Sequence, residues 1–359
     1  MPILFVPDNR SIRLFQNEFR LWYNRLSYFV RVFEIARLVL ILTVTPNAAV
    51  DKTYRIAPFL LDRVNRPCLT HTLAGGKGIN VARVYQTLGG KAIVAGFLGG
   101  VQGEIVKKAL DCEGLTQSFI EVEGETRLCI AIIDPVSGTQ TEINEQGPRV
   151  TAQNARELID LVRSLLSQRN FEFVVLSGSL PPEAPDYFYA ELIDAVKASG
   201  VKTVFDSSGV PLQKGLKAKP WMAKLNRSEM ETAVERSLPT DQSLLDAALE
   251  LHETGIPLII ATNGSRGAYL AVEGQNYIGS SAKVEFASAV ASGDSFLAAF
   301  LWALSFSDSE SSEDYAAAFK LALGAGSANA AVIGAGLCTR DSIFELARKC
   351  EVKRGARLQ

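Results

Sequence analysis

Short apolar runs rich in β-branched residues alternate along this chain with segments whose apolar residues recur at the spacing of a helix. Because a strand buried on both faces reads as a continuous apolar run, the first kind predicts strands and the second amphipathic helices. This alternation is typical of an α/β fold in which helices cover both faces of a mostly parallel sheet. The predicted strands are residues 38–44, 93–97, 173–176, 202–205 and 258–261, and the predicted helices are residues 79–88, 151–168, 185–198 and 241–254.

Two polar segments break this alternation, residues 53–72 and 121–145, and neither contains a helical pattern. Their extended character predicts β-hairpins, which we expect to form a small lid. No repeat or low-complexity linker divides the chain. We therefore expect one domain over residues 39–350 that carries the lid, followed by a C-terminal tail over residues 351–359.

The first 38 residues differ from the rest because they are rich in arginine and aromatic residues. They lack an apolar core followed by a small-residue cleavage site, and the apolar run 38–44 is too short to cross a bilayer. Their composition is compatible with a helix on a membrane surface. We prefer the hypothesis of a mispredicted start, with the working protein beginning near Val39; N-terminal sequencing of native protein that found Met1 would refute it.

The composition narrows the class of ligand. The chain has 359 residues, of which 37 are basic and 39 acidic, and the two signs are mixed along it. This balance favours neither nucleic acid nor a membrane surface as a partner and leaves small molecules. The five cysteines are scattered without a CxxC pair and only two histidines are present, so we expect a reducing, cytoplasmic location and no structural zinc site.

The most informative motif is SAVASGDSFLAAF at residues 288–300, where small residues and an aspartate precede an apolar helix. Unpaired N–H groups and the positive end of the helix dipole suit such a helix start to binding phosphate. We expect an anion hole formed by Ala291, Ser292 and Gly293. Asp294 lies beside it, where a carboxylate can take a proton from an attacking hydroxyl during phosphoryl transfer. The alternative is that Asp294 only caps the helix.

A second glycine-rich helix start, AGGKGINVAR at residues 74–83, lets the backbone approach a ligand closely. It would present Lys77 and Asn80 to that ligand, but it lacks the Walker spacing, and a plain loop is the alternative. Upstream, TPNAAVD places Asp51 after the first predicted strand, at the edge where open α/β sheets bind ligands. Asp51 could bind sugar hydroxyls or be a turn residue.

Three further motifs carry side chains that suit a nucleotide or a phosphate. Asn226 and Glu229 in KLNRSE have the spacing of a capping box, which also places an amide and a carboxylate on one helix face. The segment TNGSRG at 262–267 suits the passage of a nucleotide, or is a plain β-turn. Arg127, in a lid segment, could bind a substrate phosphate or be a solvated surface residue.

Taken in order, the motifs TPNAAVD, AGGKGINVAR, TEINEQGP, VLSGSLPP and ASGDSF resemble the PfkB (ribokinase-like) family of carbohydrate kinases over residues 40–350. The chain is most similar to the branch of 1-phosphofructokinases and tagatose-6-phosphate kinases. The resemblance implies a ribokinase-like three-layer sandwich with a small β lid, a homodimer that pairs through this lid, and the use of ATP and Mg²⁺.

The resemblance also implies a role for each candidate residue. Asp294 would be the catalytic base beside the anion hole, and Lys77 and Arg127 would bind the existing phosphate of the sugar. It further implies that Asp51, Gly76, Asn80 and Ser177 hold the sugar, that Lys224, Asn226, Thr262, Gly264 and Gly267 bind the nucleotide, and that Asn226 and Glu229 orient Mg²⁺ through water.

The sequence departs from the usual family pattern at Ala48, Leu225, Ala291 and Ser292. None of these departures removes a charged group. Ala291 would narrow the anion hole if its backbone needs a positive φ, which only glycine adopts cheaply.

We therefore expect ATP-dependent phosphorylation of a hexose monophosphate and favour fructose 1-phosphate, which gives fructose 1,6-bisphosphate. Tagatose 6-phosphate and fructose 6-phosphate stay open as acceptors. A ribokinase-like or nucleoside-kinase-like enzyme with an unphosphorylated substrate does not need the charge of Lys77 and Arg127. A non-catalytic phosphosugar-binding regulator does not need the set of Asp294, Asn226 and Glu229.

Overall fold

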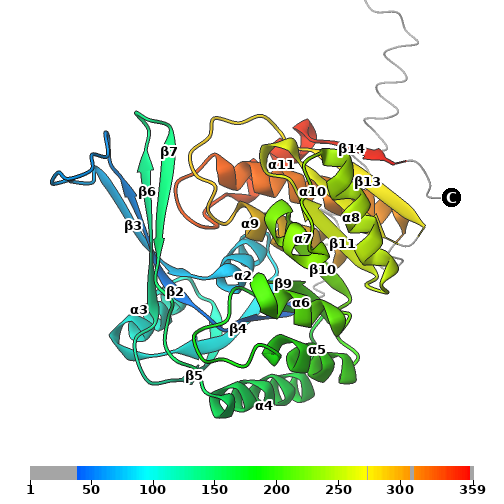
Figure 1. The fold of residues 1–359 in the computed structure, drawn as a ribbon, viewed down its shortest axis with the longest axis horizontal. Helices are drawn as coiled ribbons and strands as arrows, with labels where there is room; N and C mark the ends of the chain where they lie inside the picture. Colours follow the sequence, from blue (N-terminus) through cyan, green and yellow to red (C-terminus); the bar gives the residue numbers. More distant parts are fainter. Residues whose placement is uncertain (1–38, 273, 308–310, 356–359) are drawn as a thin grey trace, which may run out of the picture. The chain divides into compact units, whose positions relative to one another are not determined.

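A ten-stranded sheet forms the centre of the computed structural model, which describes residues 39–272, 274–307 and 311–355 (Figure 1). Its strands are β1 (Leu40–Thr45), β4 (Lys91–Leu98), β5 (Thr116–Glu121), β8 (Phe173–Ser177), β9 (Lys202–Asp206), β10 (Met222–Asn226), β11 (Leu258–Thr262), β12 (Ala268–Val272), β13 (Gln275–Ser280) and β14 (Glu351–Arg354). The order is β14-β13-β12-β11-β10-β9-β8-β1-β4-β5. Pairing is parallel from β11 to β5 and antiparallel from β11 to β14. The five predicted strands are β1, β4, β8, β9 and β11.

Successive residues of the central strands point to opposite faces of the sheet, and each face has its own hydrophobic core. Along β1, Ile41 lies in one core and Leu42 in the other, both fully buried. One core is completed by α2 (Lys77–Thr87), α3 (Gly100–Cys112), α9 (Ser292–Leu304), α10 (Ser312–Ala330) and α11 (Arg340–Lys349), and the other by α4 (Ala152–Gln168), α5 (Phe188–Ala198), α6 (Gly209–Lys217), α7 (Arg227–Val234) and α8 (Asp241–Glu253). This three-layer α/β arrangement confirms the predicted fold class, and the four predicted helices are α2, α4, α5 and α8.

Four strands form a second, smaller sheet, which Figure 1 shows apart from the main one. They are β2 (Ala49–Arg55), β3 (Leu69–Gly75), β6 (Arg127–Asp134) and β7 (Thr139–Asn144), in the order β3-β2-β6-β7. The central pair β2 and β6 is parallel and both outer pairs are antiparallel. We call this sheet the lid. Since β2 follows β1 closely and β3 leads into α2, the lid joins the main sheet at two segments that carry candidate site residues.

Two predicted boundaries differ from the structure. The lid begins at Ala49 rather than residue 53. Glu121, which was predicted to begin a lid segment, is the last residue of β5 in the main sheet, and the half-buried, polar pattern of β5 resembles that of a hairpin strand. The predicted tail contains β14, which pairs with β13, so the sheet continues beyond residue 350. β14 is an edge strand with mostly exposed side chains, and it therefore lacks the apolar run that revealed the central strands.

The extension over residues 1–38, its proposed late start and its alternative as a membrane-surface helix lie outside the described residues. Among the helices that the structure describes, none combines the length and the apolar character needed to span a membrane.

Candidate active site

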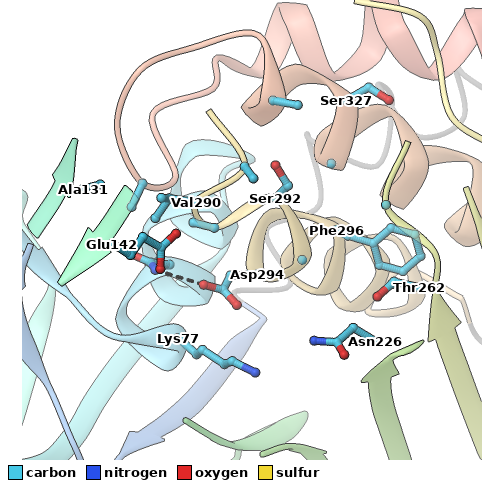
Figure 2. Close-up of a pocket in the computed structure, with 18 of the residues that line it drawn as sticks. Lys77, Ala131, Glu142, Asn226, Thr262, Val290, Ser292, Asp294, Phe296 and Ser327 are labelled. Atoms are coloured by element: carbon cyan, nitrogen blue, oxygen red, sulfur yellow. Dashed lines mark hydrogen bonds between the residues drawn. The ribbon is translucent and has the colours of Figure 1, made fainter. Parts of the chain in front are cut away.

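A pocket of about 960 Å³ lies where the lid meets the carboxyl ends of β10 and β11 and the first turns of α2 and α9. The structure brings nearly all the candidate residues together here, although they are scattered over the sequence. Those that line the pocket are Asp51, Gly76, Lys77, Asn80, Arg127, Lys224, Asn226, Thr262, Gly264, Gly267, Ala291, Ser292, Gly293 and Asp294. Figure 2 shows Lys77, Asn226 and Asp294 directed into this space from different elements.

The residues of the predicted anion hole lie at the first turn of α9, where they line the pocket. Ala291 occupies the N-cap position with φ 61° and ψ 10°, in the left-handed region, and makes no side-chain cap. The backbone of Ala291 therefore does need a positive φ, so an L-residue stands where glycine is cheaper. Asp294 lies within the first turn and not at the cap, so the alternative role as an N-cap residue is wrong. The amide groups at this helix start and the helix dipole favour a bound anion.

Asp294 is a buried carboxylate with a raised pKa in this pocket. The carboxylate is 7% exposed, and its Oδ2 accepts a hydrogen bond from Asn80 Nδ2 at 2.9 Å (Figure 2). Burial raises the pKa of Asp294 from 3.8 to about 6, and the negative charge of Asp206 adds to the rise, while Lys77 and the Asn80 hydrogen bond oppose it. A base whose pKa lies close to neutral pH can both accept and release a proton in the working range.

Asp51 is a second carboxylate with a raised pKa in this pocket. Burial raises its pKa from 3.8 to about 6, although Arg127 and Arg83 act to lower it. Gly75 allows the carboxylate its position, since a Cβ at residue 75 would lie 2.1 Å from Asp51 Cγ. Asp51 therefore offers a hydrogen-bond acceptor on the lid side of the pocket.

Asp206 was missed by the sequence reasoning and holds both pocket lysines. Its Oδ1 accepts from Lys77 Nζ at 2.5 Å and its Oδ2 from Lys224 Nζ at 2.5 Å. Burial alone would raise the pKa of Asp206, but Lys224 and Lys77 outweigh burial and hold it below 3.8. Asp206 ends β9, so the rule that singled out Asp51, a carboxylate at the carboxyl end of a strand, could have found it.

The capping box predicted at Asn226 and Glu229 is confirmed at the start of α7. Asn226 Oδ1 accepts from the Glu229 amide at 2.9 Å, and Glu229 Oε2 accepts from the Asn226 amide at 2.8 Å. Glu229 Oε1 accepts from Lys77 Nζ at 3.0 Å. Glu229 itself is buried and, unlike Asn226, does not line the pocket.

The segment after β11 forms a short 3₁₀ turn, Gly264–Arg266, which begins with one glycine and is followed by another. Gly264 has φ 59° and Gly267 has φ 106°. A Cβ at residue 267 would lie 1.9 Å from the Gly279 carbonyl oxygen, so the two backbone segments can pass each other only because no side chain is present. Thr262 precedes this turn and lines the pocket.

Of the two remaining candidates, Arg127 lines the pocket and Ser177 does not. Ser177 is fully buried, does not line the pocket, and packs against Gly78 at the start of α2, so the structure does not bring it to the proposed ligand. Arg127 does line the pocket, where its Nε donates to the Asn47 carbonyl at 3.1 Å. The lid also contributes Glu142, which the sequence reasoning quoted within TEINEQGP without giving it a role.

The sequence of the chain matches the model of a known protein family. The sequence model for "pfkB family carbohydrate kinase" matches residues 43–342. The chain belongs to the PfkB family of carbohydrate kinases. As a PfkB member it is a sugar kinase, a phosphotransferase, which confirms the family and the enzyme class predicted from the five motifs.

PfkB proteins similar to this chain agree with that assignment. A tagatose-6-phosphate kinase of Staphylococcus epidermidis is 35% identical over 262 residues, which cover 72% of this chain and 83% of that one. A possible 1-phosphofructokinase of Thermotoga maritima aligns with a TM-score of 0.79 at 26% identity, covering 88% of this chain and 100% of that one. Phosphofructokinase-2 of Escherichia coli, solved with substrates and products, gives 0.78 at 26% identity over 86% and 99%.

Proposed function

We propose that this PfkB kinase transfers the γ-phosphoryl group of ATP to a hexose monophosphate, with Asp294 as the general base, and that fructose 1-phosphate is its acceptor. The observation that carries the proposal is the buried Asp294 carboxylate beside the first turn of α9, in a pocket that also holds Lys77 and Arg127. Tagatose 6-phosphate is the second candidate, because a 35% identical relative is named for it.

The side chains of the pocket divide the work of the reaction. The attacking sugar hydroxyl gives its proton to the Asp294 carboxylate as its oxygen bonds to the γ-phosphorus, and the bond from that phosphorus to ADP breaks. The Gly293 amide, with the α9 dipole, stabilises the charge that develops on the transferred group. Asp51 and Asn80 orient the sugar by accepting from and donating to its hydroxyls.

Two cations supply a site for the phosphate that the acceptor already carries. Lys77 donates to Asp206 and Glu229, which leaves one of the three N–H groups of its ammonium for a ligand. Arg127 lies at the lid end of the pocket, where its positive charge acts to lower the pKa of Asp51. Charge-assisted hydrogen bonds to phosphate are about twice as strong as neutral ones, which favours a phosphorylated acceptor over ribose or a nucleoside.

The residues present fit a magnesium ion that is held through water. Both carboxylate oxygens of Glu229 already accept hydrogen bonds, and Asn226 faces the pocket beside it. In the described part of the chain no three acidic, histidine or cysteine side chains gather to hold a metal directly, and Mg²⁺ commonly keeps several waters when it binds with nucleotide phosphates. When bound, the ion would neutralise charge on the ATP phosphates.

A coupled assay of ADP release tests the proposal. Mg-ATP is supplied with fructose 1-phosphate, tagatose 6-phosphate, fructose 6-phosphate, ribose or adenosine, for the native protein and for Asp294→Asn. We expect turnover with one phosphosugar, abolished in the variant. Turnover only with ribose or adenosine would contradict the roles of Lys77 and Arg127, and no turnover with any acceptor would favour a regulator.

We also propose that two copies pair through the lid. Its hairpin connections and its outer strand carry several large apolar side chains in contact with solvent, among them Leu61 (83% exposed), Val64 (80%) and Ile143 (54%). A surface of this kind is typical of a protein interface. Sedimentation equilibrium should give a dimer for the native protein and a monomer for Leu61→Lys combined with Val64→Lys; a native monomer would contradict the proposal.

A further inference from the structure

Arg83, in the second turn of α2, is a buried arginine that the proposed reaction does not use. It is 7% exposed, and all five of its N–H groups have acceptors. Nε and Nη2 donate to the Glu113 carboxylate at 2.7 and 3.0 Å, and Nη2 also donates to the Ala74 carbonyl at 2.6 Å. Nη1 donates to the Ala335 carbonyl at 3.0 Å and to Asn80 Oδ1 at 2.9 Å. The guanidinium is therefore fixed by four elements of the fold.

The contact with Asn80 determines which end of that amide faces Asp294. Asn80 Oδ1 accepts from Arg83, so the opposite atom, Nδ2, is the one that donates to Asp294 Oδ2 at 2.9 Å. Arg83 has no acceptor to offer, and an ionised carboxylate has no donor, so the reversed amide would meet an unfavourable partner on both sides. Asn80 is 4% exposed, and water cannot compensate for such a reversal.

We propose that Arg83 is a positioning residue for phosphoryl transfer, which fixes the orientation of the Asn80 amide so that it donates to the catalytic carboxylate. The proposal rests on the proposed role of Asp294 as the base. The chain of contacts runs from Glu113 at the end of α3 through Arg83 and Asn80 on α2 to Asp294 on α9. Arg83 acts through Asn80, since its guanidinium donates to Asn80 and not to Asp294.

Loss of Arg83 should make the ionised base less stable. A freed Asn80 amide can turn its oxygen to Asp294, where it accepts from the protonated acid and repels the carboxylate. The other charged groups that face Asp294 are Lys77 from α2, Asp206 from β9 and Lys224 from β10, and Asp51 from the lid interacts with it. These groups stay in place when Arg83 is replaced by another cation.

The test is the pH dependence of kcat for Arg83→Lys, which keeps the charge near Asp51 but lacks the fork of N–H groups. We expect the acid limb of the profile to move to higher pH by about one unit, which is about a tenfold loss of kcat on its acid side, with the KM for ATP unchanged. Glu113→Gln is the matched control, because it weakens the ion pair and leaves the Arg83–Asn80 contact. Its acid limb should stay in place.

A double-mutant comparison separates positioning from a merely structural effect. If Arg83 acts through Asn80, Arg83→Lys should cause no further movement of the acid limb in an Asn80→Ala background. Movement in that background, or an unmoved limb in Arg83→Lys itself, would overturn the inference. Thermal melts check that each variant folds, and Arg83→Gln replaces Arg83→Lys if that variant does not.

The failure of this inference can be told from failure of the proposed function. Full turnover by Asp294→Asn would refute the role of the base and this inference with it. An inactive Asp294→Asn together with an unmoved limb in Arg83→Lys would refute the inference alone.

Discussion

Replacing Asp294 with asparagine is expected to lower kcat and, at neutral pH, to raise the free energy of unfolding. Burial is the main reason that the pKa of Asp294 rises from 3.8 to about 6. That rise corresponds to about 3 kcal/mol of the free energy of unfolding, which the native protein loses by keeping this group ionised. The asparagine of the variant would be neutral and could still accept the Asn80 hydrogen bond through its amide oxygen.

The pH dependence of this gain follows from proton binding. Between pH of about 4 and about 6 the native state holds a proton on Asp294 that the unfolded chain has already released. The unfolded state therefore binds fewer protons in this range, and the contribution of Asp294 to stability falls as the pH rises. Below the range, native protein and variant should differ little; above it, the advantage of Asp294→Asn should be complete and constant.

Asp206→Asn is the matched control, since it removes a buried carboxylate that contacts the two pocket lysines, with the opposite expectation. Lys224 and Lys77 hold the pKa of Asp206 below 3.8, so this carboxylate stabilises the native state once ionised. Its loss would leave Lys224 without the carboxylate that it contacts and Lys77 with Glu229 alone, and breaking a buried pair in this way costs about 3–5 kcal/mol. The two Asp→Asn variants should therefore change the free energy of unfolding with opposite signs.

Urea denaturation of the three proteins between pH 4 and pH 8, with ADP release measured on the same samples, checks the reasoning. We expect Asp294→Asn to lose on the order of 10²–10⁴ in kcat, the usual contribution of a general base. If Asp294→Asn is less stable than the native protein at pH 7.5, or if its advantage does not grow between pH 4 and pH 6, the assigned cause of its raised pKa is wrong.

Two further predictions concern the backbone of the site. Because the backbone of Ala291 is in the left-handed region, Ala291→Gly should raise the free energy of unfolding by about 0.5–1 kcal/mol. The control is Ala289→Gly, at a residue without a positive φ, which should lower the free energy of unfolding slightly. Thermal melts compare the two variants, and equal shifts in melting temperature would exclude relief of backbone strain at Ala291. Gly75→Ala places a Cβ 2.1 Å from Asp51 Cγ, so it should raise the KM for the sugar with little effect on the KM for ATP. Steady-state kinetics measure both constants. An unchanged KM for the sugar would show that Asp51 is not part of the acceptor site.

The sequence predicts the centre of this fold better than its edges, for a physical reason. β1, β8 and β9 are buried on both faces, so their residues form apolar runs that few other structures produce. At the edge of the sheet β14 has one neighbour and mostly exposed side chains, and its pattern resembles that of a tail. The polar, extended segments of the chain predicted the lid, but β5 is only half buried, and its last residue was therefore assigned to the lid.

The candidate site was predictable where a residue acts alone and not where it acts through a partner. Asp294 and the glycine-rich start of α2 carry local signals in the motif itself. Asp206 and Arg83 depend on contacts across the fold, Asp206 with lysines 129 and 18 residues away and Arg83 with a carbonyl 252 residues away. Topology creates such contacts, and no local spacing reveals them. Ser177 shows the converse, since a matching motif did not place its side chain in the pocket.

The arrangement of charges explains how two neighbouring buried carboxylates, Asp206 and Asp294, have pKa values that are shifted in opposite directions. Lys77 and Lys224 both donate to Asp206, and the hydrogen bond that the structure gives to Asp294 comes from the neutral amide of Asn80. If either lysine donated to Asp294 instead, the pKa of Asp294 would fall and the carboxylate would accept a proton less readily. Because Asp206 accepts from both lysines, burial remains the largest influence on the pKa of Asp294. The pocket therefore holds cations, which we propose bind phosphate, beside a carboxylate whose pKa is raised to about 6.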